Sequence, residues 1–395
     1  MHGRGWSHTW RGRLLILSLI ALVGGSCAGS TDEREPAGAA AQSTTTVDPG
    51  RDPRYSGRGP HEVGVTTLQL PDRAVEVYYP AERGSTSGKA DAVYDQTEPI
   101  PDSLRASLPA IPADVDLSVT VPAVRDVEVG SDGPFPLVIF SHGAGGWRSV
   151  YGSVLAGIAS WGFVVASTDY AEYGLLASFT PGGDPAARRS QALTSAKATI
   201  ELMITAGQTG GDRFSGSIDG ERIAAAGHSA GGGTMFGLLD DPRIKAVVGW
   251  APVGPQAPVT SRTPTLVIGG EADSAITPEV MAATFAALRA PKRRVEVARM
   301  GHNAFSDACL SIRSGTDLIG LAKSLGLPIP DRLLDLGRNG CEDADLDTKL
   351  GWSIIQHFTV AELRNVFGTD PQPVGLGAGI ETAFAGATIR LTEET

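Results

Sequence analysis

A serine stands between two glycines in the pattern that exposes a nucleophilic hydroxyl. Residues 227–231 read Gly-His-Ser-Ala-Gly, which matches G-x-S-x-G with Ser229 at its centre. A sharp strand-to-helix turn of this kind needs small neighbours, because the backbone of the serine is strained and its side chain must be exposed. Apolar residues 223–226 precede the motif, and two glycines with an apolar helical pattern follow it. The motif alone is too short to predict a nucleophile elbow, but the motif together with the strand and helix patterns around it does.

A base and an acid must accompany the serine, because its hydroxyl is a poor nucleophile near neutral pH. Of the seven histidines, His302 is the candidate base, since it follows the segment 295–298 that is predicted to be the last strand. The acid is expected just after the strand predicted at 265–269, where the sequence offers Glu271 and Asp273. Asp273 is favoured because the acid of such loops lies a few residues past its strand, and Glu271 is the fallback.

Two backbone amides must also face the negative charge that develops on the substrate oxygen. The residue after the nucleophile, Ala230, supplies one of them. The other is expected from Ala144, in the glycine-rich loop that follows the apolar run 135–140.

Trp147 and Trp250 could line an acyl pocket, or could equally be ordinary packing residues. The glycine-rich loop is not expected to bind phosphate, because the sequence lacks the patterns G-x-x-x-x-G-K-[ST] and G-x-G-x-x-G after a first strand.

The first residues read as an export signal. Three arginines precede a ten-residue apolar run at 14–23, which is too short to cross a bilayer but typical of a signal peptide. Small residues and then Cys27 follow, as in bacterial lipoprotein signals. We expect residues 1–26 to be removed, Cys27 to be lipidated, and residues 27–60 to form a disordered tether. The protein would then be an outward-facing membrane lipoprotein, or a secreted protein if the signal is of the ordinary kind.

Composition and cysteine content limit which partners, disulfides and metal sites the protein could have. The 395 residues are 42% hydrophobic and 19% charged, with a formal net charge of −11, which argues against a nucleic-acid partner. Cys309 and Cys341 form the only other cysteine pair, and in an exported protein such a pair is expected to be a disulfide rather than two buried thiols. A zinc site is not expected, because two cysteines alone lack further ligands at useful spacing.

Apolar strands alternate with amphipathic helices through the body of the chain. This alternation predicts a doubly wound, mostly parallel sheet with helices on both faces. The catalytic domain is expected at 61–370 with an insert at 306–349, followed by a C-terminal extension at 371–395. The predicted strands are 63–70, 74–79, 135–140, 163–167, 223–226, 244–250, 265–269 and 295–298, and the clearest helices cover 151–158, 200–203, 278–288 and 350–366.

Together these motifs resemble the serine α/β-hydrolases that include platelet-activating-factor acetylhydrolases, dienelactone-hydrolase-like proteins and bacterial cutinases and polyester hydrolases. The motifs are 77–80 (Val-Tyr-Tyr-Pro), 140–143 (Phe-Ser-His-Gly), 162–165 (Gly-Phe-Val-Val), 227–232 (Gly-His-Ser-Ala-Gly-Gly) and 301–305 (Gly-His-Asn-Ala-Phe). The chain order serine, acid, histidine also agrees. The resemblance implies an α/β-hydrolase fold, ester hydrolysis without a cofactor, and oxyanion amides at Ala144 and Ala230. Dienelactone hydrolase itself uses a cysteine, so the serine here does not imply that substrate.

The sequence therefore favours a carboxylic-ester hydrolase that acts through an acyl-enzyme on short-to-medium acyl esters or lipid-like esters. Three alternatives remain open. The same groups could serve an acyltransferase or a peptidase. A polyester hydrolase is the second, although the insert at 306–349 is longer than an open polymer-binding groove needs. The third is a non-catalytic binding protein on a hydrolase scaffold.

Overall fold

The computed structural model describes residues 48–100, 102–106, 110–112, 115–179, 183–315, 318–324 and 331–395. The expected signal peptide, the expected lipidation site at Cys27 and the first part of the expected tether lie outside these residues. Within the described residues, no helix is long and apolar enough to cross a membrane.

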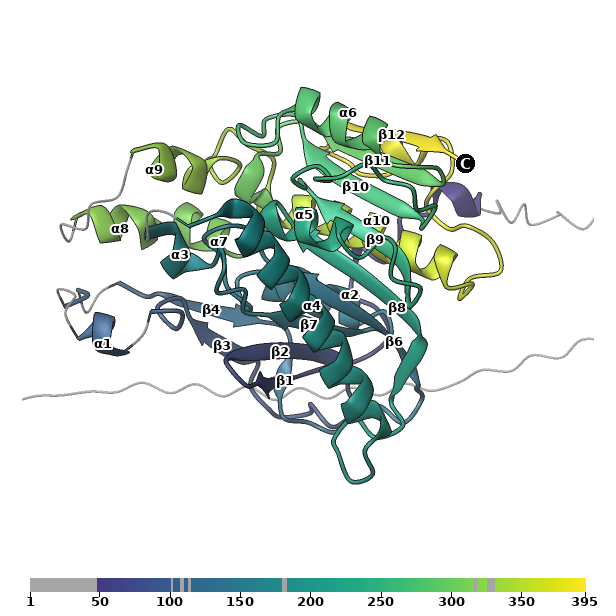
Figure 1. Ribbon diagram of the computed structural model, residues 1–395, viewed down its shortest axis with the longest axis horizontal. Helices are drawn as coiled ribbons and strands as arrows, with labels where there is room; N and C mark the ends of the chain where they lie inside the picture. Colours follow the sequence, from purple (N-terminus) through teal and green to yellow (C-terminus); the bar gives the residue numbers. More distant parts are fainter. Residues whose placement is uncertain are drawn as a thin grey trace, which may run out of the picture. The chain divides into compact units, whose positions relative to one another are not determined.

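A ten-stranded sheet forms the centre of the body, in the order β12-β11-β10-β9-β8-β6-β7-β2-β1-β5 (Figure 1). Neighbouring strands from β7 through β6, β8, β9 and β10 to β11 are all parallel. The pairs β7–β2, β2–β1 and β11–β12 are antiparallel, and β5 adds parallel to β1 at the edge. The predicted mostly parallel sheet is thus confirmed. The strands are β1 (Val63–Leu70), β2 (Arg73–Pro80), β5 (Val124–Arg125), β6 (Phe135–Ser141), β7 (Val164–Thr168), β8 (Ile218–His228), β9 (Ile244–Trp250), β10 (Thr265–Gly270), β11 (Lys292–Val297) and β12 (Ile389–Glu394).

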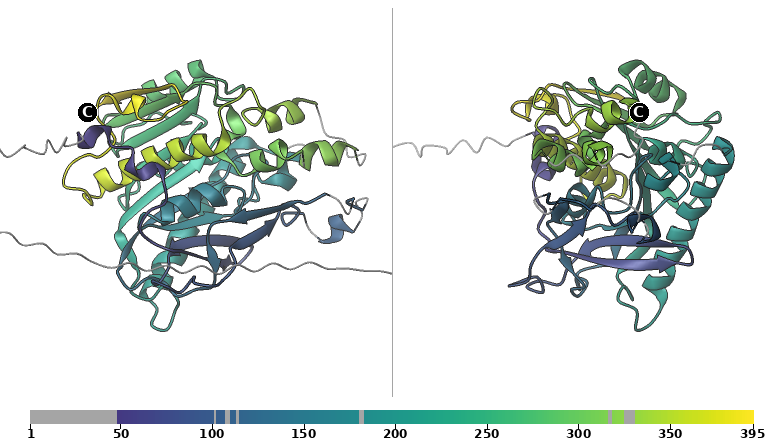
Figure 2. Two further views of the ribbon diagram at one scale, coloured as in Figure 1. Left: turned by 180° about the vertical axis from the view of Figure 1, so that it is seen from behind. Right: turned by 90° about the vertical axis from the view of Figure 1, so that its left-hand side faces the viewer.

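The central strands are buried on both faces. Every residue of β6, β7 and β10 is buried, which explains why these segments are continuous apolar runs rather than alternating ones. Helices α4 and α6 cover one face in Figure 1, and α2 and α10 cover the other in the view from behind (Figure 2). The helices are α1 (Asp102–Arg105), α2 (Gly152–Ala159), α3 (Leu175–Phe179), α4 (Pro185–Gln208), α5 (Ala230–Phe236), α6 (Pro278–Ala287), α7 (Ala308–Arg313), α8 (Leu318–Ser324), α9 (Asp331–Arg338) and α10 (Thr348–Val366).

Local sequence signals explain several boundaries. Helix α6 begins as its Thr-Pro pair predicts, because Thr277 is the N-cap and Pro278 is the first helical residue. Short 3-10 turns supplement the helices: η1 (Pro49–Arg51), η2 (Arg54–Ser56), η3 (His302–Phe305) and η4 (Ile380–Thr382). The stretch 81–134, in which the sequence predicted no strand, contains a small antiparallel pair, β3 (Ala92–Asp95) with β4 (Ser118–Val121).

Two predicted boundaries are wrong. The expected tether was drawn to residue 60, but Tyr55 is buried, its hydroxyl lies 2.5 Å from a carboxylate oxygen of Asp370, and its ring packs edge-on against Trp161. Buried Tyr55, together with hydrogen bonds such as those from the amides of Gly375 to Pro49 (2.8 Å) and Gly377 to Gly50 (2.9 Å), docks this otherwise polar segment. The C-terminal extension was expected to follow the domain, but β12 adds to the sheet edge beside β11, so 295–298 is not the last strand.

Candidate active site

Ser229 lies at the turn between β8 and α5, where its φ of 52° is rare for a residue with a side chain. The two motif glycines make that turn possible. A Cβ on Gly231 would lie 2.2 Å from the backbone oxygen of Ser141, and one on Gly227 would lie 2.6 Å from the backbone of Gly231. The predicted elbow therefore forms, because small residues let three backbone segments meet around the serine.

The structure brings the serine together with the predicted base and acid. The Ser229 Oγ lies 3.0 Å from His302 Nε2, and His302 Nδ1 lies 2.8 Å from Asp273 Oδ2. All three side chains are at least nine-tenths buried. These distances let the Nδ1–H of His302 donate to the carboxylate while Nε2 accepts the serine proton, which is the arrangement required for base-assisted attack by a hydroxyl.

Asp273 is fixed by its own backbone neighbours. Its Oδ1 accepts hydrogen bonds from the amides of Ala275 (2.8 Å) and Ile276 (2.7 Å), so the other oxygen is directed at the histidine. The fallback acid, Glu271, instead pairs with Arg390 at 2.8 Å. The geometry therefore selects Asp273 over Glu271.

The two predicted oxyanion amides lie at the right elements. Ala230 is the first residue of α5, where backbone N–H groups have no helical partner, and Ala144 is exposed in the loop after β6. No described residue accepts a hydrogen bond from either amide. The loop is held from behind, since the amide of Gly145 donates to the Tyr173 carbonyl at 2.8 Å. Both amides are thus available to a negatively charged oxygen.

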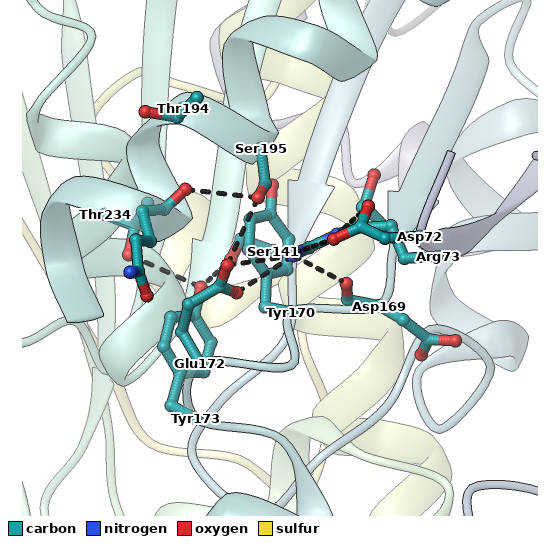
Figure 3. A network of polar contacts seen from close by, with 12 residues as sticks. Asp72, Arg73, Ser141, Asp169, Tyr170, Glu172, Tyr173, Thr194, Ser195 and Thr234 are labelled. Atoms are coloured by element: carbon teal, nitrogen blue, oxygen red, sulfur yellow. Dashed lines mark hydrogen bonds and ion pairs between the residues drawn. The ribbon is translucent and has the colours of Figure 1, made fainter. Parts of the chain in front are cut away.

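Tyr173 links the end of β6, which precedes the Ala144 loop, to α5, which begins at Ala230. Figure 3 shows its side chain beside those of Ser141 and Thr234. Its hydroxyl lies 2.5 Å from Ser141 Oγ, at the end of β6, and 3.4 Å from Thr234 Oγ1 on α5. The Thr234 hydroxyl donates to the Ala230 carbonyl at 3.1 Å, so Tyr173 donates to Thr234 and accepts from Ser141. The sequence does not predict this role, because nothing in the spacing of Tyr173 marks it.

His228, inside the elbow, supports the base rather than replacing it. Its Nε2–H donates to the backbone carbonyl of His302 at 3.0 Å, and its Nδ1 accepts from the Tyr151 hydroxyl at 2.8 Å. The Tyr151 oxygen in turn accepts from the amide of Gly143 at 3.2 Å. Burial, together with the nearby His302, holds the pKa of His228 well below its usual value, so the ring stays neutral.

His142 orders the glycine-rich loop in the same neutral form. Its Nδ1–H donates to the carbonyl of Gly143, and its Nε2 accepts from the amide of Tyr170, each at 2.9 Å. Burial lowers the pKa of His142, which preserves this donor and acceptor pattern. Neither His142 nor His228 is in contact with the serine oxygen, in agreement with the choice of His302 as base.

The tryptophans proposed for an acyl pocket are packing residues. Trp250 has no exposed surface, lies between Phe140 and Phe305, and donates its indole N–H to Thr359 at 3.1 Å. Trp147 is also buried and lines a small internal cavity that none of the three candidate catalytic side chains reaches. The pocket-lining interpretation of Trp250 is therefore wrong, because a strand end that points into the core offers no surface to a ligand.

The disulfide predicted from the cysteine pair is present between Cys309, in α7, and Cys341. It joins the two ends of the insert close to His302. Among the described residues, no group of three or more His, Cys, Asp or Glu side chains could hold a metal ion.

Comparisons with known proteins agree with this architecture. A family model described as PET hydrolase-like matches residues 146–315, and one described as platelet-activating factor acetylhydrolase, isoform II, matches residues 53–201. Platelet-activating factor acetylhydrolase of Cavia porcellus is 26% identical in an alignment of 245 residues that covers 50% of this chain and 54% of that protein. The Gallus gallus enzyme of the same name is 29% identical over 31% of this chain and 32% of its own. The chain thus spans about half the length, or less, of the curated relatives that it matches.

A solved structure extends the likeness over most of the chain. Ferulic acid esterase from Streptomyces cinnamoneus superimposes with a TM-score of 0.57 at 19% identity, covering 85% of this chain and 97% of its own. The α/β-hydrolase fold is thereby confirmed. The resemblance of the sequence to the esterase group of α/β-hydrolases is also confirmed by the family and sequence matches.

Proposed function

We propose that this α/β-hydrolase is a carboxylic-ester hydrolase that acts through a covalent acyl-enzyme. The observation that carries the proposal is the continuous hydrogen-bonded chain from Ser229 through His302 to Asp273. It is supported by the matches to acetylhydrolases and to a PET hydrolase-like family. The likeness in sequence and the geometry point to the same chemistry.

In the first step, the Ser229 oxygen attacks the ester carbonyl while His302 Nε2 takes its proton. The carbonyl oxygen becomes an oxyanion, which the amides of Ala144 and Ala230 stabilise. When the intermediate collapses, the bond to the alcohol oxygen breaks and His302 returns the proton to the leaving alcohol. Asp273 holds the imidazole in the required tautomer and stabilises its cation throughout.

In the second step, water replaces the alcohol. His302 takes a proton from the water as its oxygen attacks the acyl-enzyme carbonyl, and the same amides stabilise the second oxyanion. Collapse breaks the acyl bond to Ser229 and releases the carboxylic acid. No other reagent is needed, because the imidazole that accepts the water proton returns it to the serine oxygen.

We infer that the substrates are short-to-medium acyl esters or lipid-like esters. The acetylhydrolase likeness supports small acyl groups, since its name describes removal of an acetyl group. A polyester is the second candidate, because the PET hydrolase-like match covers residues 146–315 and so includes the serine, the acid and the base. Release of soluble products from a polyester film would favour this candidate over the first.

The test compares the wild-type chain with Ser229→Ala on p-nitrophenyl esters of graded acyl length. Loss of the nucleophile should lower kcat by about a millionfold. Ser190→Ala is the matched control, because that serine is exposed on α4 and is distant from Ser229 in the sequence.

A fluorophosphonate probe should label Ser229 in the wild-type protein. A chain that is neither labelled nor active would be a binding protein, and a product carrying an added alcohol would indicate acyl transfer.

We also propose that the protein is exported and anchored by a lipid on Cys27. The arginine-rich start, the short apolar run at 14–23 and the small residues before the cysteine support this. Labelled fatty acid should be incorporated into the wild-type protein in a bacterial host, and Cys27→Ser should abolish that incorporation. A wild-type chain that is cleaved after another residue and released without lipid would indicate an ordinary secretory signal.

A further inference from the structure

One amide side chain from the insert lies between the loops that carry the acid and the base. Asn339 Oδ1 accepts hydrogen bonds from the backbone amides of His302 (2.8 Å) and Ser274 (3.0 Å). Its Nδ2 donates to the carbonyl of Ala272 at 2.9 Å. Asn339 thus holds both backbone neighbours of Asp273 and the backbone of His302 with a single planar group.

We infer that Asn339 is a positioning residue that sets the distance between the Asp273 carboxylate and the His302 imidazole. The inference rests on the proposed function, because it assigns a role within that site. Asn339 has no contact with the serine oxygen and does not itself react. Only an amide side chain supplies this pattern, since the two N–H groups need an acceptor and the carbonyl needs a donor on the same rigid plane.

The segment that carries Asn339 is held against the base by three further contacts. The Asn339 carbonyl accepts from the amide of Asn303 at 2.8 Å. Gly301 and Gly340 are in direct contact, because a Cβ on Gly301 would lie 2.4 Å from the Gly340 nitrogen. The φ of Gly340 is 95°, which a residue with a side chain rarely adopts. The next residue, Cys341, is covalently joined to Cys309.

These contacts give the insert a function that its length alone does not explain. The insert at 306–349 begins just after the loop that carries His302. The disulfide joins Cys341, near the end of the insert, to Cys309, near its start, and so keeps Asn339 beside His302. The acid and the base come from separate loops after β10 and β11. A side chain bonded to both loops reduces their independent motion, and small misplacements of a base are costly to catalysis.

A purely structural role for Asn339 makes a different prediction. If the side chain only anchored the insert, its loss would lower stability and the fraction of active protein, but each folded molecule would keep its turnover. A positioning role lowers kcat per active site with KM unchanged, because ester binding does not depend on the acid and base geometry. Titrating active sites with a fluorophosphonate separates the two.

The experiment compares wild-type protein with Asn339→Ala, Asn339→Asp and the control Asn365→Ala, whose residue is partly exposed near the end of α10. Asn339→Ala should lower kcat per labelled site by about tenfold to hundredfold, with KM within twofold of wild type. Asn339→Asp keeps the acceptor and loses the donor, which gives a folded variant if alanine is not tolerated. It should lower kcat per labelled site less than Asn339→Ala does, because the amides of His302 and Ser274 keep their acceptor.

A spectroscopic readout separates this inference from the proposed function. The proton shared by His302 Nδ1 and Asp273 should give a far-downfield NMR resonance in Ser229→Ala protein, which cannot turn over ester. Asn339→Ala in that background should shift or broaden the resonance, and Asn365→Ala should not. An unchanged resonance, together with wild-type kcat per site in Asn339→Ala, would overturn the inference. If the wild-type protein hydrolysed no ester, the proposed function would fail, while the resonance would still decide whether Asn339 positions the pair.

Discussion

Asp273 and His302 share a 2.8 Å hydrogen bond although 29 residues separate them in the chain. Both Asp273 oxygens are occupied, one by the histidine and one by two backbone amides, so the carboxylate has a single orientation. Such a carboxylate holds the imidazole with its free nitrogen toward the serine.

Asp273→Asn should therefore lower kcat by about ten-thousandfold at neutral pH, because an amide in place of the carboxylate permits the wrong tautomer of His302. Steady-state kinetics on a p-nitrophenyl ester would measure this loss. Glu271→Gln is the matched control, since it changes the nearby carboxyl group that binds Arg390 instead. Removal of that partly exposed ion pair should leave kcat within about twofold of wild type. A larger loss in the control than in Asp273→Asn would mean that Glu271 is the acid.

Tyr173→Phe should reduce kcat by about threefold to tenfold, with little change in KM, because only the hydroxyl linking Ser141 to Thr234 is lost. This hydroxyl connects the end of β6 to α5. The loop after β6 and the start of α5 carry the oxyanion amides, whose relative position matters most in the transition state. Measurement of kcat and KM separately would show the effect.

Tyr170→Phe is the control for this variant. Its ring stacks on Tyr173 at 5.5 Å between centroids, and its buried hydroxyl lies near Ser141 but forms no hydrogen bond of normal geometry with a described residue. This variant should keep the wild-type kcat, since it removes an unsatisfied polar group. Equal effects in the two variants would show that the loop responds to any change in polarity, and that the link through Tyr173 is not specific.

The sequence predicted most of the fold and the three candidate catalytic residues because the signals are local. Buried parallel strands are continuous apolar runs, and Ser229, Asp273 and His302 each follow the end of one of them. Carboxyl ends of parallel strands share one edge of a sheet, so residues placed there by sequence also meet in space. Close approach of backbones at the elbow requires glycines, which the motif displays directly.

The supporting residues could not be predicted, because their hydrogen-bond partners are distant in the sequence and no regular spacing of residues links them. Tyr151, Tyr173 and Asn339 each act through two or three side-chain hydrogen bonds to other segments, and a tyrosine or asparagine carries no mark of such bonds in the sequence. The docking of Tyr55 and the pairing of β12 with β11 likewise depend on surfaces that exist only once the sheet has formed. For Trp250 the choice between pocket lining and core packing stayed open for the related reason that the sequence does not say which side of a strand end faces the core.

Tyr151→Phe should destabilise the protein by about 1–3 kcal/mol, because it leaves the amide of Gly143 and Nδ1 of His228 without their buried partner. The same loss should lower kcat, since His228 holds the backbone of His302 and Gly143 adjoins the Ala144 amide. Urea unfolding at several pH values and steady-state kinetics would measure the two effects. A variant with wild-type stability would show that water or another group replaces the hydroxyl.

Asp307 joins the segment after His302 to helix α2 and gives the protein a pH-dependent stability. Its Oδ2 accepts from the amide of Ser153, in the first turn of α2, at 3.0 Å, and no described residue pairs with its Oδ1. The N-cap position of α2, Tyr151, offers no side-chain cap, so this distant carboxyl takes that role. Burial raises the pKa of Asp307 to about 7.

The sign of the effect follows from the raised pKa of Asp307. Between about pH 4, near the ordinary pKa of an unfolded aspartate, and the folded value of about 7, the folded protein holds a proton at Asp307 that the unfolded chain has lost. The contribution to the free energy of unfolding is therefore fully present below pH 4. It falls by roughly 1.4 kcal/mol per pH unit as the pH rises to 7, and changes no further above that.

Asp307→Asn should remove this slope, because its amide cannot ionise but its oxygen can still accept from Ser153. The difference in unfolding free energy between wild type and variant, measured by urea unfolding from pH 4 to pH 8, should move steadily in favour of the variant up to about pH 7 and then stay constant. Asp240→Asn, at an exposed aspartate, is the control and should follow the wild-type curve. Parallel curves for wild type and Asp307→Asn would show that the carboxyl at 307 is ionised throughout, and that burial does not govern its protonation.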